Sequence, residues 1–201
     1  MRPIAVALVC LDLALPTSAL AERFTGKVVG VTDGDTLTVV QDKTRVTVRL
    51  RGVDAPEMSQ PYGEKAKQLT TKLVLGKRVT VKVAGRDRAR RSVVGSVHFT
   101  VREGVDHYDD GSFAFVDVEH SLEEELLKAG LAWWYRPRVP DDRRLAALAA
   151  AAAKAKRGLW ADERAVPPWV SRNPRDKTDP YLERRLQEGG TDRKAGVFRK
   201  D

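Results

Sequence analysis

The sequence predicts an α+β fold, mainly β, in which a five-stranded barrel of the OB type carries three helices. Runs rich in Val and Thr, separated by turn signals, dominate residues 24–118 and are typical of consecutive strands. A segment with helical spacing follows the third run, and more such segments fill much of the chain after residue 120. This order of elements is that of an OB barrel, a fold that often binds nucleic acids or sugars but does not by itself give an activity.

The strands are expected at 27–33, 36–41, 45–53, 77–84 and 92–101, where β-branched residues recur between polar turn residues. Residues 61–76 have helical spacing instead, with Ala66, Leu69 and Leu73 on one face and Gly76 as the stop signal. The polar run 102–112 is expected to be a loop.

The second and third helices are expected at 121–130 and about 141–158. Ser121 is the expected N-cap of the former, with glutamates in its first turn and Gly130 after its end. The latter opens on Asp141 or Asp142, and its alanines favour a helix that approaches its neighbour closely. One domain over 24–165 is therefore expected. The tail 171–201 has few apolar residues and many charges, which predicts disorder.

The first 21 residues have the pattern of an export signal peptide, with a basic start, an apolar run over 4–15 and an A-x-A cleavage signal at 19–21. The alternative is a short N-terminal anchor or a buried first element. Cleavage would remove Cys10, the single cysteine, so the mature protein would contain no disulfide. We therefore expect a periplasmic or secreted protein, by default a monomer. No apolar run approaches the roughly 20 residues that a membrane span needs.

The net charge of +8, from 36 Lys and Arg against 28 Asp and Glu, favours a polyanionic partner such as nucleic acid or an anionic membrane surface. Against this basic background, acidic residues gather at two places, "DGD" at 33–35 and "DAPE" at 54–57. Gly34 allows a tight turn, so that Asp33 and Asp35 can point to one place. Pro56 fixes the backbone after Ala55, which could present the carbonyl of that residue.

These oxygen donors suit a hard cation, and calcium tolerates their irregular geometry better than magnesium does. Zinc is a poor candidate, because the three histidines outside the signal peptide have no paired spacing and cysteine is absent there. Arg49, on the strand before the second acidic pair, and further arginines within 86–91, among them Arg88, could clamp a phosphodiester through bidentate hydrogen bonds. On this pattern alone, an ordinary turn and a loop with solvated charges remain the alternative.

Several motifs in a consistent order resemble the staphylococcal nuclease (thermonuclease) family over roughly residues 24–160. They are "DGDT" at 33–36, "RLRGVDAPE" at 49–57, "PYGEKA" at 61–66, "GLA" at 130–132 and "RGLW" at 157–160. The resemblance implies an OB barrel and hydrolysis of DNA and RNA that leaves 3′-phosphate ends.

Residue by residue, the resemblance implies that Asp35 and Asp54 are carboxylate ligands of Ca²⁺, with the Ala55 carbonyl beside them. It implies that Glu57 is the general base that activates or orients the attacking water. Arg49 and Arg91 would be the two arginines that bind the phosphate.

The chain departs from the family pattern before the second of these arginines. The family commonly has "D-[KR]-Y-G-R" there, whereas residues 87–91 read "DRARR". Ala89 replaces the tyrosine that would lie against the nucleotide, and Arg90 replaces the glycine. Arg91 is therefore the expected phosphate ligand, and Arg90 is the alternative.

Trp133 and Tyr135 lie where the family places aromatic residues near the nucleotide base, and stacking on such rings tolerates any sequence. The alternative is that the tryptophans pack between helix and barrel. Two rival functions remain for the whole chain. One is a nuclease-like barrel that only binds nucleic acid, and the other is an exported interaction protein that uses the basic tail.

Overall fold

The computed structural model describes residues 22–87, 91–105 and 114–172. The predicted signal peptide, Arg88, Arg90 and the predicted tail from residue 173 onward lie outside these ranges. Within them, every helix is too short or too polar to cross a bilayer. The strands are β1 (Arg23–Val31), β2 (Thr36–Gln41), β3 (Thr44–Leu50), β4 (Val53–Asp54), β5 (Arg78–Asp87), β6 (Ser92–Val105), β7 (Ala114–Ser121) and β8 (Trp133–Trp134). The α-helices are α1 (Gly63–Val74), α2 (Leu122–Lys128), α3 (Arg143–Lys154) and α4 (Pro168–Arg172), and short 3-10 helices span Arg136–Arg138 and Gly158–Ala161.

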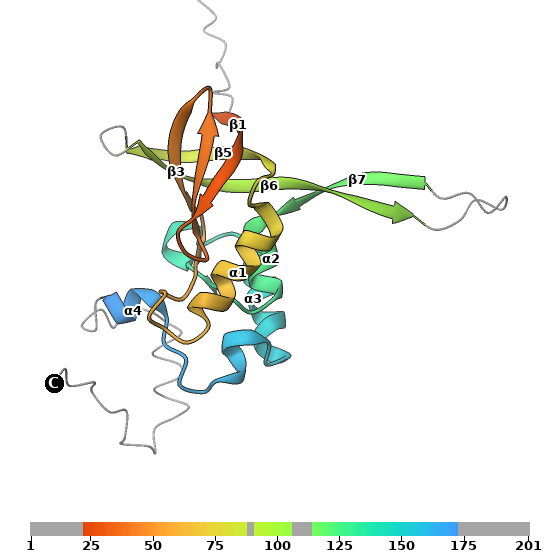
Figure 1. Cartoon of the computed structure of the whole chain (residues 1–201). Coiled ribbons are helices and arrows are strands. Elements are labelled where there is room, and N and C mark those ends of the chain that lie inside the picture. The colour runs from red at the N-terminus through yellow and green to blue at the C-terminus, as the bar shows by residue number, and fades with distance from the viewer. Residues whose placement is uncertain (1–21, 88–90, 106–113, 173–201) are drawn as a thin grey trace, which may run out of the picture.

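The long strands form one curved sheet in the order β3-β2-β1-β5-β6-β7 (Figure 1). β3 also pairs with β6 in parallel, with Thr47 opposite Ser92 and Leu50 opposite Gly95. This extra pairing closes β1, β2, β3, β5 and β6 into a barrel. The structure thus confirms the predicted class, an α+β fold with a five-stranded barrel of the OB type.

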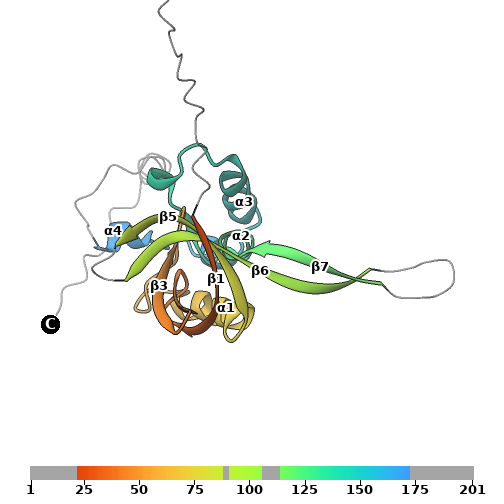
Figure 2. The same cartoon turned by 90° about the horizontal axis from the view of Figure 1, so that it is seen from above.

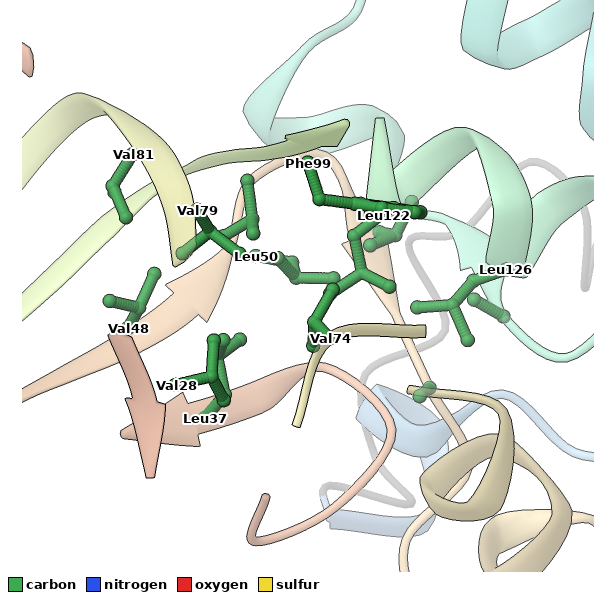
Figure 3. Close-up of a cluster of buried hydrophobic side chains, with 14 of the residues drawn as sticks. Val28, Leu37, Val48, Leu50, Val74, Val79, Val81, Phe99, Leu122 and Leu126 are labelled. Carbon is green, nitrogen blue, oxygen red and sulfur yellow. The ribbon is translucent and has the colours of Figure 1, made fainter. Parts of the chain in front are cut away.

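Alternation along the strands determines which side chains fill the barrel. On β2 and β3, Leu37, Val39, Val46, Val48 and Leu50 are buried, while their neighbours in sequence are half-buried or exposed. Figure 3 shows Leu37, Val48 and Leu50 meeting side chains from α1, β5, β6 and α2 in one apolar cluster. Burial of this kind stabilises a fold by about 25 cal/mol for each Å² of apolar surface removed from water.

The three predicted helices are present, and their ends follow from local chemistry. Ser121 caps α2 by accepting a hydrogen bond from the backbone N–H of Glu124. Of the two aspartates considered for α3, it is Asp142 that caps the helix, through the N–H of Leu145 at 3.0 Å. α3 ends at Lys154, earlier than expected, and Gly158 instead begins a 3-10 helix.

The strand β6 is longer than the sequence suggested. Residues 102–105, which were expected to be loop, continue β6, and β7 pairs with it from Ser121 back to Ala114. The two strands form an arm that extends well beyond the barrel (Figures 1 and 2). Val116 and Val118 alternate with polar residues, as Val101 does with its neighbours. Because polar residues are so frequent here, this alternation is difficult to recognise in the sequence.

The helix α4 was not predicted, and the first two residues of the expected tail, Ser171 and Arg172, belong to it. Its first residue is a proline, whose fixed backbone angle favours the first turn of a helix. Pro167 and Pro168 are buried against the body of the domain, so this segment packs on the fold before the described chain ends.

Candidate active site

The "DGD" segment is a tight turn that leads into β2. The Asp33 carboxylate accepts a hydrogen bond from the backbone N–H of Asp35 at 3.0 Å, which fixes the turn. A Cβ atom at Gly34 would lie 2.6 Å from the Cβ of Ala55 and 2.7 Å from that of Ala66. Only glycine therefore lets the turn pack against both the "DAPE" loop and α1, and this contact brings the two acidic motifs together.

The Asp35 side chain is buried and joins the turn to the second motif. Its Oδ2 atom accepts the backbone N–H of Ala55 at 3.1 Å, and its Oδ1 atom accepts the hydroxyl of Thr36 at 2.9 Å. Burial raises the pKa of Asp35 to about 7; the charge of Arg49 opposes this rise, and nearby aspartates add to it. The carboxylate therefore lies where additional positive charge would stabilise its ionised form.

Asp54, on the short strand β4, is the second buried carboxylate and is only 2% exposed. β4 pairs with β8, so that Asp54 lies opposite Trp133. The Nη2 atom of Arg49 lies 2.9 Å from the Oδ1 atom of Asp54 and 3.9 Å from the Oδ2 atom of Asp35. Two buried carboxylates and the guanidinium thus meet at one point, while 40% of the Arg49 side chain remains exposed.

Glu57 lies at the edge of this cluster and is 39% exposed. Its backbone N–H donates to the Gln60 side chain at 2.8 Å, which holds the loop before α1 in place. A Cβ atom at Gly63 would lie 2.1 Å from the Glu57 carbonyl oxygen, so the glycine of "PYGEKA" allows this loop to pack against the start of α1. The sequence motif therefore serves to position Glu57.

Arg172 of α4 also reaches the cluster, and sequence reasoning missed it. Its Nη2 atom lies 2.5 Å from the Oδ2 atom of Asp54, and its Nη1 atom donates to the Oε1 atom of Glu57. Asp54 is therefore bonded to two arginines, one five residues before it and one 118 residues after it. A separation of 115 residues from Glu57 leaves no periodic or motif signal that could have indicated this contact.

The second predicted phosphate ligand, Arg91, lies at the surface just before β6. Arg91 is exposed and has a positive φ of 49°, and its carbonyl oxygen accepts the backbone N–H of Thr47 just before β6 begins. Among the described side chains, those that pair with Asp54 are Arg49 and Arg172. Arg88 and Arg90 lie outside the described residues, so the choice between Arg90 and Arg91 stays a prediction.

The two predicted stacking residues lie beside α4. Trp133 is only 3% exposed, with its ring 4.6 Å from that of Trp160 and 6.1 Å from that of Trp169. The Tyr135 ring lies 5.2 Å from the Trp169 ring. Trp169 therefore lies next to both rings, and Trp133 also packs against Trp160.

The donors of the cluster fit a hard cation that keeps many water ligands. Asp35, Asp54 and the carbonyl of Ala55 all offer oxygen, which calcium prefers. The parts of the chain that the structure describes contain no group of three or more His, Cys, Asp and Glu side chains placed to hold a metal. An ion bound here would thus rely on two carboxylates, a carbonyl, and water or substrate oxygens.

Comparisons with known proteins identify the family of the chain. The family model described as "Staphylococcal nuclease homologue" matches residues 47–162. An "Uncharacterized endonuclease" of Escherichia coli is 36% identical over 148 residues, which cover 74% of this chain and 84% of the relative. A similar "Uncharacterized endonuclease" of Haemophilus influenzae is 34% identical over 148 residues, or 73% of this chain and 72% of the relative. A "Micrococcal nuclease" of Shigella flexneri is 31% identical over 170 residues, or 84% of this chain and 90% of the relative.

Proposed function

The chain belongs to the staphylococcal nuclease family and is a nuclease, and from this premise we propose that it is an exported, calcium-dependent enzyme. It hydrolyses phosphodiester bonds of DNA and RNA and leaves 3′-phosphate ends. The observation that carries the proposal is the convergence of Arg49 on the buried carboxylates of Asp35 and Asp54. The buried acidic pair can bind a cation, and the partly exposed guanidinium beside it can bind a phosphate next to that cation.

In this proposal, Asp35, Asp54 and the Ala55 carbonyl hold calcium. The bound ion would supply positive charge that polarises the phosphoryl oxygens. Arg49 binds a phosphate oxygen and stabilises the negative charge that develops in the transition state. Its partial exposure supports this role, because the guanidinium can reach a substrate while its Nη2 atom stays with Asp54.

Glu57 acts as the general base and removes a proton from the attacking water. Its exposure at the rim of the cluster, beyond the buried pair, gives a water molecule access to it. Arg91, whose side chain is exposed, binds a second phosphate oxygen. Trp133 and Tyr135 are candidates for contact with the bases.

The test is a cleavage assay on labelled single-stranded DNA and RNA, with calcium and with EDTA. Calcium should support cleavage of both substrates and chelation should abolish it, with half-maximal activity at about 10⁻⁴–10⁻³ M calcium, as in extracellular calcium modules. Enzymatic end-labelling before and after phosphatase treatment should identify 3′-phosphate ends. Full activity in EDTA would refute the metal assignment, and 3′-hydroxyl ends would refute the proposed product.

Export is proposed from the first 21 residues and needs its own measurement. The chain carrying these residues should be found in the periplasm or the medium of a bacterial host, with a mature N-terminus at Glu22. Deleting 2–21 should keep it in the cytoplasm. An uncleaved product that remains in the cytoplasm would refute this part of the proposal.

A further inference from the structure

The segment that leads into α4 is attached to the loop that carries Glu57. The Gln60 side chain donates a hydrogen bond to the Val166 carbonyl oxygen at 3.0 Å, while its own oxygen holds the Glu57 backbone. Pro167 and Pro168 are buried, so the chain enters α4 along a fixed path. α4 therefore lies against the candidate active site through several contacts.

Trp169 supplies the apolar part of this attachment. Its ring meets Trp133 nearly edge-on, at 6.1 Å and 78°, and meets Tyr135 at 5.2 Å and 52°. Aromatic pairs in such arrangements contribute beyond their buried area. The two partners are the residues that the proposed function assigns to the nucleotide bases, so Trp169 competes with a base for the same surface.

Arg172 supplies the charged part. It bonds Asp54, proposed as a calcium ligand, and Glu57, proposed as the general base. The Oδ2 atom of Asp54 accepts from Arg172, while its Oδ1 atom accepts from Arg49, so both oxygens of this carboxylate are engaged by guanidinium groups. A calcium ion that binds Asp54 therefore competes with these guanidinium groups for the same two oxygens.

We propose that α4 is an intramolecular latch, in which Arg172 and Trp169 together close the site and are displaced by a divalent cation and by nucleic acid. The latch rests on the proposed function, because that function assigns Asp54, Glu57 and the aromatic pair their roles. In the closed form Glu57 is ion-paired and the aromatic surface is covered, so the chain is inactive until α4 moves away.

The strength of the contacts is suited to a reversible latch. The side chains of Arg172 and Glu57 are 41% and 39% exposed, and pairs as accessible as this are screened by solvent and contribute modestly. The pair with Asp54 is stronger, because Asp54 is buried. If the closed form outnumbers the open form by about ten to one, the apparent affinity for calcium falls roughly tenfold.

The test is titration of the purified protein with calcium alone, followed by calorimetry, for the wild type and three variants. Arg172→Gln should bind calcium about fivefold more tightly, because the cation no longer competes with the Arg172 guanidinium. Trp169→Ala should also bind calcium several-fold more tightly, although it changes no charge. Arg164→Gln is the matched control, because Arg164 is exposed and pairs with Asp162, and it should bind like the wild type.

Tryptophan emission in EDTA gives a readout that needs no metal. Arg172→Gln should shift the emission to longer wavelength, because Trp169 spends more time in water, whereas Arg164→Gln should not. Unchanged emission would overturn the latch. So would wild-type calcium affinity in Trp169→Ala, since Arg172 would then act only as a local charge.

Cleavage assays separate the latch from the proposed function. Both latch variants should reach half-maximal cleavage at lower calcium than the wild type. Tighter calcium binding without any cleavage would refute the proposed function and leave the latch standing. Slower cleavage by Arg172→Gln at saturating calcium, with unchanged calcium affinity, would overturn the latch and place Arg172 in the substrate-binding surface.

Discussion

Replacing the buried carboxyl of Glu123 by the amide in Glu123→Gln should stabilise the protein at alkaline pH and have no such effect in acid. Glu123 lies in the first turn of α2, is 2% exposed, and accepts the backbone N–H of Val97 at 3.1 Å and the Ser121 hydroxyl at 2.9 Å. Burial raises the pKa of Glu123 to about 7, although these hydrogen bonds act in the opposite direction. The ionised form therefore destabilises the folded state.

The size and the pH window follow from the two pKa values of Glu123. The folded state, with its pKa of about 7, holds the proton more tightly than the unfolded chain, whose value is near 4.5. Below pH 4.5 both states are protonated and there is no penalty. The penalty grows as the pH rises to 7 and is constant above it. At 1.36 kcal/mol for each pKa unit, it amounts to on the order of 3 kcal/mol.

Urea unfolding of the wild type and Glu123→Gln gives the difference between their free energies of unfolding. The effect is the change in this difference between pH 4.5 and pH 8.5. The glutamine keeps an acceptor for Val97 and donates to Ser121, so the variant should gain about 2–3 kcal/mol between the two pH values. Glu124→Gln is the contrasting control: hydrogen bonds from Arg144 lower the pKa of Glu124, so the stability that this carboxylate contributes is lost only in more acidic solution, and the difference for this variant should stay nearly constant between pH 4.5 and pH 8.5. If the stability difference between Glu123→Gln and the wild type does not change with pH, ionised Glu123 does not destabilise the folded state and the reasoning is refuted.

Three further outcomes are expected. Glu57→Gln should lower turnover by about 10²–10⁴-fold in the cleavage assay and leave substrate affinity nearly unchanged; wild-type turnover would make this residue structural. Arg91→Lys should be almost inactive, because lysine loses the bidentate fork, whereas Arg90→Lys should cleave nearly normally; the reverse result would move the assignment by one residue. Gly34→Ala should lower the free energy of unfolding by about 1–3 kcal/mol, because the new methyl group overlaps two alanines. Gly85→Ala, with no atom within 4 Å of its added Cβ, should be tolerated, and equal losses for both would contradict the packing.

The barrel was predictable because local alternation and turn chemistry agree with the fold. Buried Leu37, Val39 and Val48 alternate with half-buried or exposed neighbours, and Gly76 ends the first helical segment with a positive φ. The parallel pairing of β3 with β6 has no local signal, since it joins residues far apart in sequence. The arm was missed because β6 continues through Arg102, Glu103 and Gly104, residue types that also mark loops.

The candidate site was predictable only in part, because some of its contacts join residues that are far apart in sequence. Motifs place Asp35 and Asp54 near one another because Gly34 permits a close approach, and this is a property of short sequence segments. The contact of Arg172 with Glu57 depends on the path of the chain after the third helix. Sequence reasoning assigned Arg172 to a charged tail, because a five-residue helix with one tryptophan has too little periodicity to be recognised.

The stability of Arg172→Gln without and with calcium is a further consequence of the latch. In EDTA the variant leaves buried Asp54 with one arginine instead of two, so its free energy of unfolding should fall by about 1 kcal/mol, a modest loss because Arg172 is partly exposed. With saturating calcium, the wild type has already released Arg172. The two proteins should then be equally stable, because their bound states contain the same contacts.

The change in stability of Arg172→Gln and its change in calcium affinity belong to one thermodynamic cycle. A chain that loses about 1 kcal/mol in EDTA and regains it with calcium must bind calcium about fivefold more tightly, since 1.4 kcal/mol corresponds to a factor of ten. Urea unfolding over a range of calcium concentrations therefore checks the calorimetric affinity independently. If the difference between Arg172→Gln and the wild type stays constant from EDTA to saturating calcium, Arg172 remains bound to Asp54 alongside the ion. The guanidinium would then be a permanent structural partner of the cluster, and α4 would not be a latch.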